Sequence, residues 1–207
     1  MLFRSSGIKL VSNQICYSLL DRRASGEMSE ICQEFGIKLF AFGTLAGGFL
    51  SKKWLGKKEP KISDDLNWSQ MKYKRFIDVT GGWKKFQNLL KTLDELSIRN
   101  NTSISNISSR YILEDPNVAS VIIGARLGES DHINENKKIY DVNFSEEDKK
   151  LLSKSLNLLD VVPGDCGDEY RKPPFLTASG DLSHHLSSMP KVYEISKVTK
   201  KIGRAHV

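Results

Sequence analysis

The sequence contains few of the residues that build disulfide frameworks or metal centres. Its three cysteines, Cys16, Cys32 and Cys166, are an odd number and include no CxxC pair. Unpaired thiols of this kind indicate a reducing compartment and do not support a zinc site. The adjacent His184 and His185 have no cysteine or helically spaced carboxylate near them, so they do not indicate a metal site either.

Long apolar runs are also lacking. No segment reaches the roughly 18 apolar residues of a membrane span, and the longest candidate, 37–50, is interrupted by Gly43, Gly47 and Gly48. The N-terminal MLFRSSGIKL has neither a long apolar core nor the cleavage pattern of a secretory signal. We therefore expect a cytoplasmic protein that does not associate with membranes.

Charge of one sign is not concentrated in any part of the chain. The sequence has 31 Lys and Arg against 25 Asp and Glu, a net charge of +6, and the lysines alternate with acids through the helical segments. This pattern does not indicate a nucleic-acid-binding surface. A length of 207 residues is sufficient for one domain with a sizeable core.

Short apolar runs alternate with helical patterns, which predicts an α/β protein. Residues 9–17, 37–41 and 118–123 have the composition of strands. The third of these is rich in β-branched residues, which predicts a strand of a parallel sheet buried on both faces. Apolar residues at helical spacing predict helices over 27–35, 83–96, 103–113 and 144–159.

The segment after the third predicted strand has the features of an anion site. Beyond Gly124 the sequence becomes polar, and residues 128–131 offer the chemistry of a helix start, with a short helix expected over 133–139. Arg126 and His132 lie on either side of that start. Unpaired helix amides and these basic side chains would attract an anion, and we expect a phosphate.

Three stretches resemble the aldo-keto reductases, which are (β/α)8 barrels that use NADP(H) to reduce carbonyl compounds. IIGAR followed by HINEN, at 122–126 and 132–136, is similar to the cofactor-binding end of that family. VSNQICYSLLDRR at 11–23 and LFAFGTLAGGFLSKK at 39–53 resemble earlier parts of the same family, in the same order. The resemblance extends over about 8–185 and corresponds to the second half of the barrel.

The resemblance implies the C-terminal part of a (β/α)8 TIM barrel, with about three parallel strands and their covering helices in an incomplete barrel. A complete barrel has roughly 250 residues. Residues 1–160 would form this partial barrel, and residues 161–200, rich in Pro, Gly and Asp, an irregular tail. The final KIGRAHV, 201–207, resembles a translated sequencing adapter, and we interpret it as non-native and without order.

The resemblance assigns the nicotinamide and pyrophosphate contacts to the first two strands. Gln14 would hydrogen-bond the nicotinamide carboxamide, because an amide both donates and accepts; alternatively, it satisfies neighbouring backbone groups. Phe42 would stack on the nicotinamide ring; taken alone, an aromatic residue here is more often part of the core, but the loop that follows favours the stacking role. The loop with Gly43, Leu45 and Gly48 would contact the pyrophosphate, since glycine lets the backbone approach a ligand closely.

The resemblance assigns the 2′-phosphate to basic residues after the third strand. Arg126 would form paired, charge-assisted bonds to phosphate oxygens, which favours NADP over NAD. His132 matches a position where many family members have a second basic residue. Leu127 replaces a serine or asparagine common in the family, which removes one phosphate hydrogen bond. The alternatives are that Arg126 caps carbonyls or pairs with Glu129, and that His132 is an ordinary surface residue.

Two further features follow from the resemblance. Glu135 and Asn136 match the pair that holds the adenine. Residues 51–79 are basic, contain Trp54 and Trp68, and show no sustained period. In the family this region is a variable loop that closes over cofactor and substrate; the alternative is a solvated connection anchored by the two tryptophans.

No catalytic residue can be assigned from the sequence. The family's proton donor is a tyrosine assisted by lysine, aspartate and histidine, all from earlier strands, and Tyr17, Tyr73 and Tyr111 do not have that context. The first hypothesis is the cofactor-binding half of an NADP(H)-dependent reductase of small carbonyl compounds. The second is a non-catalytic nicotinamide-binding or regulatory module. The third is a truncated product without an independent role.

Overall fold

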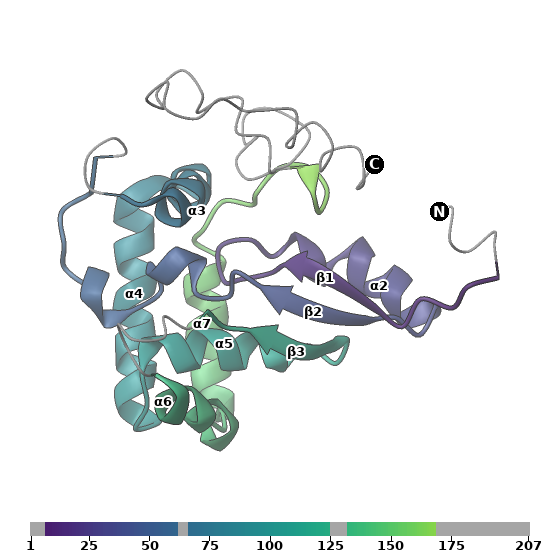
Figure 1. The fold of residues 1–207 in the computed structure, drawn as a ribbon. Coiled ribbons are helices and arrows are strands. Elements are labelled where there is room, and N and C mark those ends of the chain that lie inside the picture. Colours follow the sequence, from purple (N-terminus) through teal and green to yellow (C-terminus); the bar gives the residue numbers. More distant parts are fainter. Residues whose placement is uncertain (1–6, 62–65, 125–131, 169–207) are drawn as a thin grey trace.

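A parallel sheet of three strands forms the centre of the fold. The computed structural model describes residues 7–61, 66–124 and 132–168. Strands β1 (Ser12–Cys16), β2 (Lys38–Phe42) and β3 (Val118–Ile122) lie in the order β1-β2-β3, with both neighbouring pairs parallel (Figure 1). The three predicted strands and their parallel arrangement are therefore confirmed.

The register brings the carboxyl ends of the strands to one level. Cys16 pairs with Phe42, and Phe42 with Ile122. An irregularity between Leu39 and Phe40 shifts the pairing of β2 with β3 by one residue. The loops that follow β2 and β3 therefore leave the sheet at the same edge.

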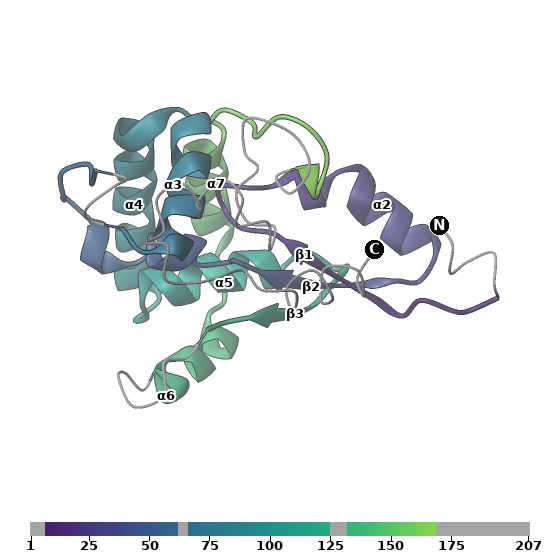
Figure 2. The ribbon, with the colours of Figure 1, turned by 45° about the horizontal axis from the view of Figure 1, so that its top comes forward.

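Six α-helices accompany the strands within the described residues. Four of them, α2, α4, α5 and α7, confirm the helices that apolar spacing predicts. In Figures 1 and 2, α3, α4 and α7 gather beyond the carboxyl ends of the strands, and α2 lies over one face of the sheet. Their bounds are α2 Glu27–Glu34, α3 Trp68–Val79, α4 Gly82–Arg99, α5 Ile104–Leu113, α6 Ile133–Lys137 and α7 Glu146–Leu156. In this part of the chain no helix is long and apolar enough to cross a bilayer.

Two apolar clusters hold these elements together. One face of the sheet packs on α2 and α5, where Leu39 and Ala41 of β2 meet Cys32 and Ile112. The larger cluster joins α3, α4, α5 and α7 around buried leucine and phenylalanine side chains of α4. The apolar side chains that the sequence predicts along one side of α4 thus lie at the centre of the main core.

The prediction that β3 is buried on both faces is wrong. Val118 is buried, but Ile122 is 42% exposed, and Phe40 of the neighbouring strand is 38% exposed. The physical reason is that β3 is an edge strand of the described sheet. On the same face, Cys16 and Phe42 pack against the main core at the carboxyl end of the strands, but that core leaves Ile122 exposed. This face of the three-stranded sheet is therefore partly open.

Residues 51–79 contain more regular structure than the sequence analysis indicates. Helix α3 begins with a capping box in which Asn67 Oδ1 accepts from the Gln70 amide and Gln70 Oε1 accepts from the Asn67 amide. The reading of the whole segment as a loop is therefore wrong. Trp54 does act as an anchor: its ring lies 4.7 Å from that of Phe49.

The chain beyond α7 packs back onto the body without regular structure over 161–168. Val162 is buried, and Arg23 Nη1 donates to the carbonyl oxygen of Asp165 at 2.6 Å. The remainder of the predicted tail, with His184 and His185, and the predicted artefact 201–207 lie outside the described residues. The predicted domain boundaries remain predictions.

The start of α7 is fixed by Asp148, which is only 6% exposed. Its carboxylate accepts from the Ser145 amide at 3.3 Å, from Asn100 Nδ2 at 3.4 Å and from Arg99 Nη1 at 3.4 Å. Burial raises the pKa of Asp148, but the hydrogen bonds from Ser145, Asn100 and Arg99 outweigh it, so the pKa is lowered overall.

We predict that Asp148→Asn lowers the free energy of unfolding at neutral pH by about 1–3 kcal/mol. Because the folded-state pKa is depressed, the stabilisation is present above the unfolded pKa of about 4 and is lost as pH falls through the folded value. Urea unfolding measured from pH 7 to pH 2 should show a smaller decrease in the free energy of unfolding at acid pH in the variant than in wild type. The control is Asp160→Asn, which removes a carboxylate from the exposed pair with Lys85. If the free energy of unfolding of wild type and of Asp148→Asn depended on pH in the same way, Asp148 would not be the source of this stabilisation.

Candidate functional site

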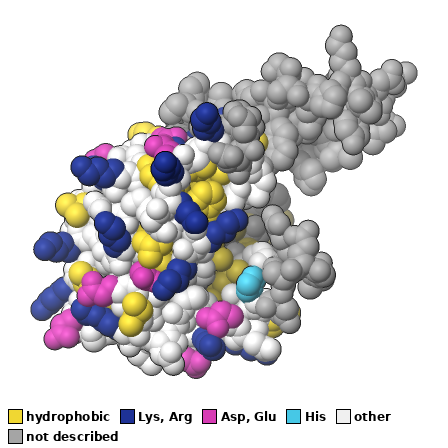
Figure 3. Space-filling view, turned by 90° about the vertical axis from the view of Figure 1, so that its left-hand side faces the viewer, with side chains coloured by type: hydrophobic (Ala, Val, Ile, Leu, Met, Phe, Trp, Pro, Cys, Tyr) yellow, Lys and Arg dark blue, Asp and Glu magenta, His cyan; other side chains and the backbone are white. Residues whose placement is uncertain are grey.

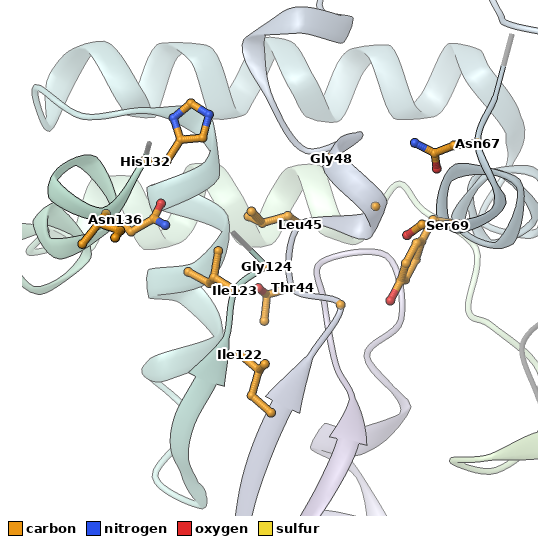
Figure 4. A pocket seen from close by; sticks show the side chains of 14 residues that line it. Thr44, Leu45, Gly48, Asn67, Ser69, Ile122, Ile123, Gly124, His132 and Asn136 are labelled. Carbon is orange, nitrogen blue, oxygen red and sulfur yellow. The ribbon is translucent and has the colours of Figure 1, made fainter. Parts of the chain in front are cut away.

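A cavity of about 620 Å³ lies at the carboxyl edge of the sheet. The loop after β2 and the end of β3 form its floor, α6 lies on one side and the start of α3 on the other (Figure 4). Segments far apart in the sequence therefore share one concavity. The lining residues are Gly43, Thr44, Leu45, Gly47, Gly48, Asn67, Ser69, Tyr73, Ile122, Ile123, Gly124, His132, Ile133 and Asn136.

Five of the nine predicted cofactor residues line this cavity. They are Gly43, Leu45, Gly48, His132 and Asn136. Figure 4 shows His132 and Asn136 on the side opposite Asn67 and Ser69, with Leu45 and Gly48 between them. Gln14, Phe42 and Glu135 are not among the lining residues, and Arg126 lies outside the described residues.

The loop 43–48 has an unusual backbone. Gly43, Gly47 and Gly48 have φ angles of 71°, 63° and 88°, and Ala46 has a φ of 48°. Glycine adopts this left-handed conformation freely, whereas an alanine costs about 1–2 kcal/mol. The buried Ala46 shows that the surrounding packing determines the path of the loop.

Tyr73 of α3 packs directly on this loop. A Cβ added to Gly43 would collide with the Tyr73 hydroxyl, and one added to Gly47 would lie 2.8 Å from the Tyr73 ring. Gly48 differs, because a Cβ there would meet nothing within 4 Å. Of the three glycines in this loop, two thus admit a tyrosine, and Gly48 leaves open space for a ligand.

Phe42, at the end of β2, is half-buried and packs against the main core. Lys72 Nζ lies 5.3 Å from the Phe42 ring centroid and 5.2 Å from that of Tyr73. These cation–π distances place a positive charge beside the cavity wall.

Gln14 lies two residues before the end of β1. It pairs with Phe40 in the register, and its side chain is exposed. Because alternate strand residues share a face, Gln14 is on the same side of the sheet as Phe42. Gln14 is thus exposed on this side of the sheet, whereas Phe42 packs against the main core, and neither residue lines the cavity.

The helix expected after β3 consists of α6 and a 3-10 turn, Lys138–Asp141. His132 is the N-cap of α6 and makes no side-chain capping bond. The expected helix start at 128–131 lies outside the described residues. At five residues, α6 is too short to provide a helix dipole of consequence, so side chains and loop amides must supply the affinity for an anion.

Glu135 points away from the cavity, toward α5. Asn106 Nδ2 donates to the Glu135 carbonyl oxygen at 2.8 Å and to Oε1 at 3.3 Å, and Lys138 Nζ lies 2.9 Å from Oε2. Glu135 lines a second groove, of about 520 Å³, with the α4–α5 connection.

Two of the three tyrosines singled out in the sequence lie away from this site. Tyr17 Oη donates to Asp115 Oδ2 at 3.2 Å, and both Tyr17 and Tyr111 line a separate hollow with Pro116, before β3. Burial, then the charge of Asp115, raises the pKa of Tyr17. Tyr73 lines the cavity, whose described lining contains no lysine or carboxylate beside it. The arrangement assigns no proton donor.

Sequence reasoning missed several lining residues. Ser69 and Tyr73 belong to α3 and Asn67 is its N-cap; the signal for this helix was the Asn67–Gln70 spacing typical of a capping box. Thr44 and Gly47 lie inside a loop that the sequence had already identified. No local signal marks Tyr73, because its role depends on contact with a distant loop.

Comparisons with known proteins agree with this geometry. The sequence profile of the Aldo/keto reductase family matches residues 2–157. A curated relative, the "Uncharacterized oxidoreductase YrpG" of Bacillus subtilis (strain 168), is 26% identical over 163 residues, which cover 77% of this chain and 42% of the relative.

Solved structures show the same fold. The glycerol dehydrogenase AKR11B4 from Gluconobacter oxydans has a TM-score of 0.61 at 17% identity, over 79% of this chain and 47% of that one. The aldo-keto reductase AKR11C1 from Bacillus halodurans (holo form) has a TM-score of 0.52 at 22% identity, over 74% and 44%. The chain therefore spans less than half the length of these relatives, and its open sheet corresponds to part of their (β/α)8 barrels. On the match to residues 2–157, the chain belongs to the aldo/keto reductase family.

Proposed function

We propose that the chain is the cofactor-binding half of an NADP(H)-dependent aldo-keto reductase that acts on small aldehydes and ketones in the cytoplasm. The observation that carries this proposal is the shared cavity between the loop 43–48 and the segment after β3. Ligands of parallel α/β folds bind at the carboxyl ends of the strands, where this cavity lies. When bound, the reduced nicotinamide would supply a hydride to the carbonyl carbon, and the proton for the carbonyl oxygen would come from a separate donor.

The loop 43–48 would hold the pyrophosphate. Gly48 combines a left-handed backbone with open space beside it, so a phosphate oxygen can approach the peptide. Leu45 lines the same cavity and would exclude water from one side of the ligand. These features fit a dinucleotide better than a compact sugar or amino acid.

The adenosine end would lie beside α6. Arg126 and His132 would bind the 2′-phosphate, and Asn136 would contact the adenine from the cavity side. Glu135 would contribute from the neighbouring groove. The charge of Arg126 favours NADP over NAD, despite the loss of one hydrogen bond at Leu127.

The nicotinamide end would lie over the open face of the sheet. Phe42 would stack on the ring, with Lys72 as a nearby positive charge, and Gln14 would hydrogen-bond the carboxamide. Burial of a nicotinamide on this face would cover part of the exposed surface around Phe40 and Ile122.

One observation favours a second candidate, a nicotinamide-binding module without turnover. The described cavity lining contains Tyr73 but no aspartate or glutamate, and Lys72 lies over the face of the Tyr73 ring, at 5.2 Å from its centroid, and does not line the cavity. Titration of the 207-residue chain with NADPH by fluorescence tests both candidates, followed by assays of NADPH-dependent reduction of small aldehydes. Saturable binding with turnover supports the reductase, and saturable binding alone supports the module. The absence of saturable binding would refute both.

A matched pair of glycines tests the pyrophosphate contact. Gly48 and Gly56 both have positive φ and open space, but only Gly48 lines the cavity. We predict that Gly48→Ala and Gly56→Ala lower the free energy of unfolding similarly, by about 1 kcal/mol. Only Gly48→Ala should weaken NADPH binding, by roughly tenfold, because its methyl group occupies the space of a phosphate. If both variants bind NADPH as tightly as wild type, the loop is not the pyrophosphate site.

Arg126→Met tests the preference for NADP. Loss of charge-assisted bonds to the 2′-phosphate should weaken NADPH binding by roughly tenfold to a hundredfold, with NADH binding unchanged. The control is Lys150→Met, which removes the same charge from a surface of α7 remote from the cavity. Equal losses for NADPH and NADH in Arg126→Met would argue against 2′-phosphate recognition by this side chain.

A further inference from the structure

Asn106 is a buried amide that joins α5 to α6. It is the third residue of α5, in the first turn of that helix, and is 1% exposed. Nδ2 donates to Thr102 Oγ1 at 2.9 Å, to the Glu135 carbonyl oxygen at 2.8 Å and to Glu135 Oε1 at 3.3 Å. The Nδ2 group therefore donates to both the backbone and the side chain of Glu135, the middle residue of α6.

Only the Nδ2 group of this amide, and not its oxygen, forms hydrogen bonds within the described residues. Asn106 Oδ1 is buried, and it has no hydrogen-bond partner among the described residues. A buried acceptor left unpaired costs about 1–3 kcal/mol, so an aliphatic side chain would suit this position better if the amide only filled space. The three acceptors around Nδ2 account for an asparagine here.

Helix α6 depends on such a contact for its position. It has five residues and no side-chain cap, and Ile133 is half exposed, so little burial within α6 itself holds it in place. Its fixed points are Ile139 in the following turn, which is buried, and Glu135, which is bound to Asn106. Asn136 and His132 lie on either side of Glu135 in the sequence and both line the cavity.

We infer that Asn106 is a positioning residue for the adenosine end of the cofactor site: by holding Glu135 against α5, it fixes Asn136 and His132 on the cavity wall. This inference rests on the proposed function, because it assigns a role within the same cavity. Asn106 does not itself contact the ligand.

The substitution that tests this inference is Asn106→Asp, which keeps the shape and replaces the donor with an acceptor. The new carboxylate would face the carbonyl oxygen and the carboxylate of Glu135, and repulsion would displace α6. Asn100→Asp is a matched control. Asn100 Nδ2 donates to the Leu96 carbonyl oxygen and to Asp148 Oδ2, so that variant also sets a carboxylate against an acidic side chain, but at α7.

Binding is measured with three probes on the 207-residue chain: NADPH, 2′,5′-ADP, which has only the adenosine end, and NMNH, which has only the nicotinamide end. Asn106→Asp should weaken the binding of NADPH and of 2′,5′-ADP by roughly tenfold and leave the binding of NMNH unchanged. A general loss of structure would instead weaken the binding of all three probes. Asn100→Asp should preserve all three affinities. Asn106→Ser, which removes the amide without adding charge, should show the same selective loss and replaces Asn106→Asp if that variant does not fold.

The outcomes separate this inference from the proposed function. If wild type binds none of the probes, the proposed function fails and the role of Asn106 fails with it. If wild type binds and the Asn106 variants bind all three probes equally well, only the inference is overturned. An equal loss for 2′,5′-ADP and NMNH would also overturn it, because Asn106 would then support the whole fold and not one end of the site.

Discussion

The parallel pairing of β2 with β3 determines where the site of this protein lies. Because Phe42 is level with Ile122, the loop 43–48 and the segment leading to α6 leave the sheet at one edge. The cavity between them depends on this register. A shift of one residue would move the ends of the two strands apart in level and would turn each side chain of the shifted strand to the opposite face of the sheet. Every role that we propose for cofactor binding follows from this arrangement.

The contact between Tyr73 and the loop 43–48 shapes the cavity. The ring occupies space that side chains at Gly43 and Gly47 would fill, so it fixes α3 over the loop. The glycines thus serve two purposes: Gly43 and Gly47 admit a protein side chain, and Gly48 leaves room for a ligand. On the other side, the amide of Asn106 places α6, so the two walls of the cavity are held by different kinds of interaction.

The sequence predicted the strands, four helices and the family, because each depends on local periodicity or on motifs within one segment. It failed where tertiary context decides. The exposure of Ile122 follows from the edge position of β3, which composition does not reveal, and Tyr73 reaches its loop from a segment without clear periodicity. The contact of Glu135 with the adenine remains a prediction, and its attachment to Asn106, 29 residues away, has no sequence signal.

The central claim is that one cavity, formed by the loop 43–48 and the residues after β3, binds NADPH. Hydrogen–deuterium exchange of the 207-residue chain, with and without saturating NADPH, tests the location of binding directly. The account predicts slower amide exchange in 43–48 and 132–136, with no change in α7 (Glu146–Leu156). Binding accompanied by protection elsewhere, with exchange in both of these segments unaltered, would contradict it.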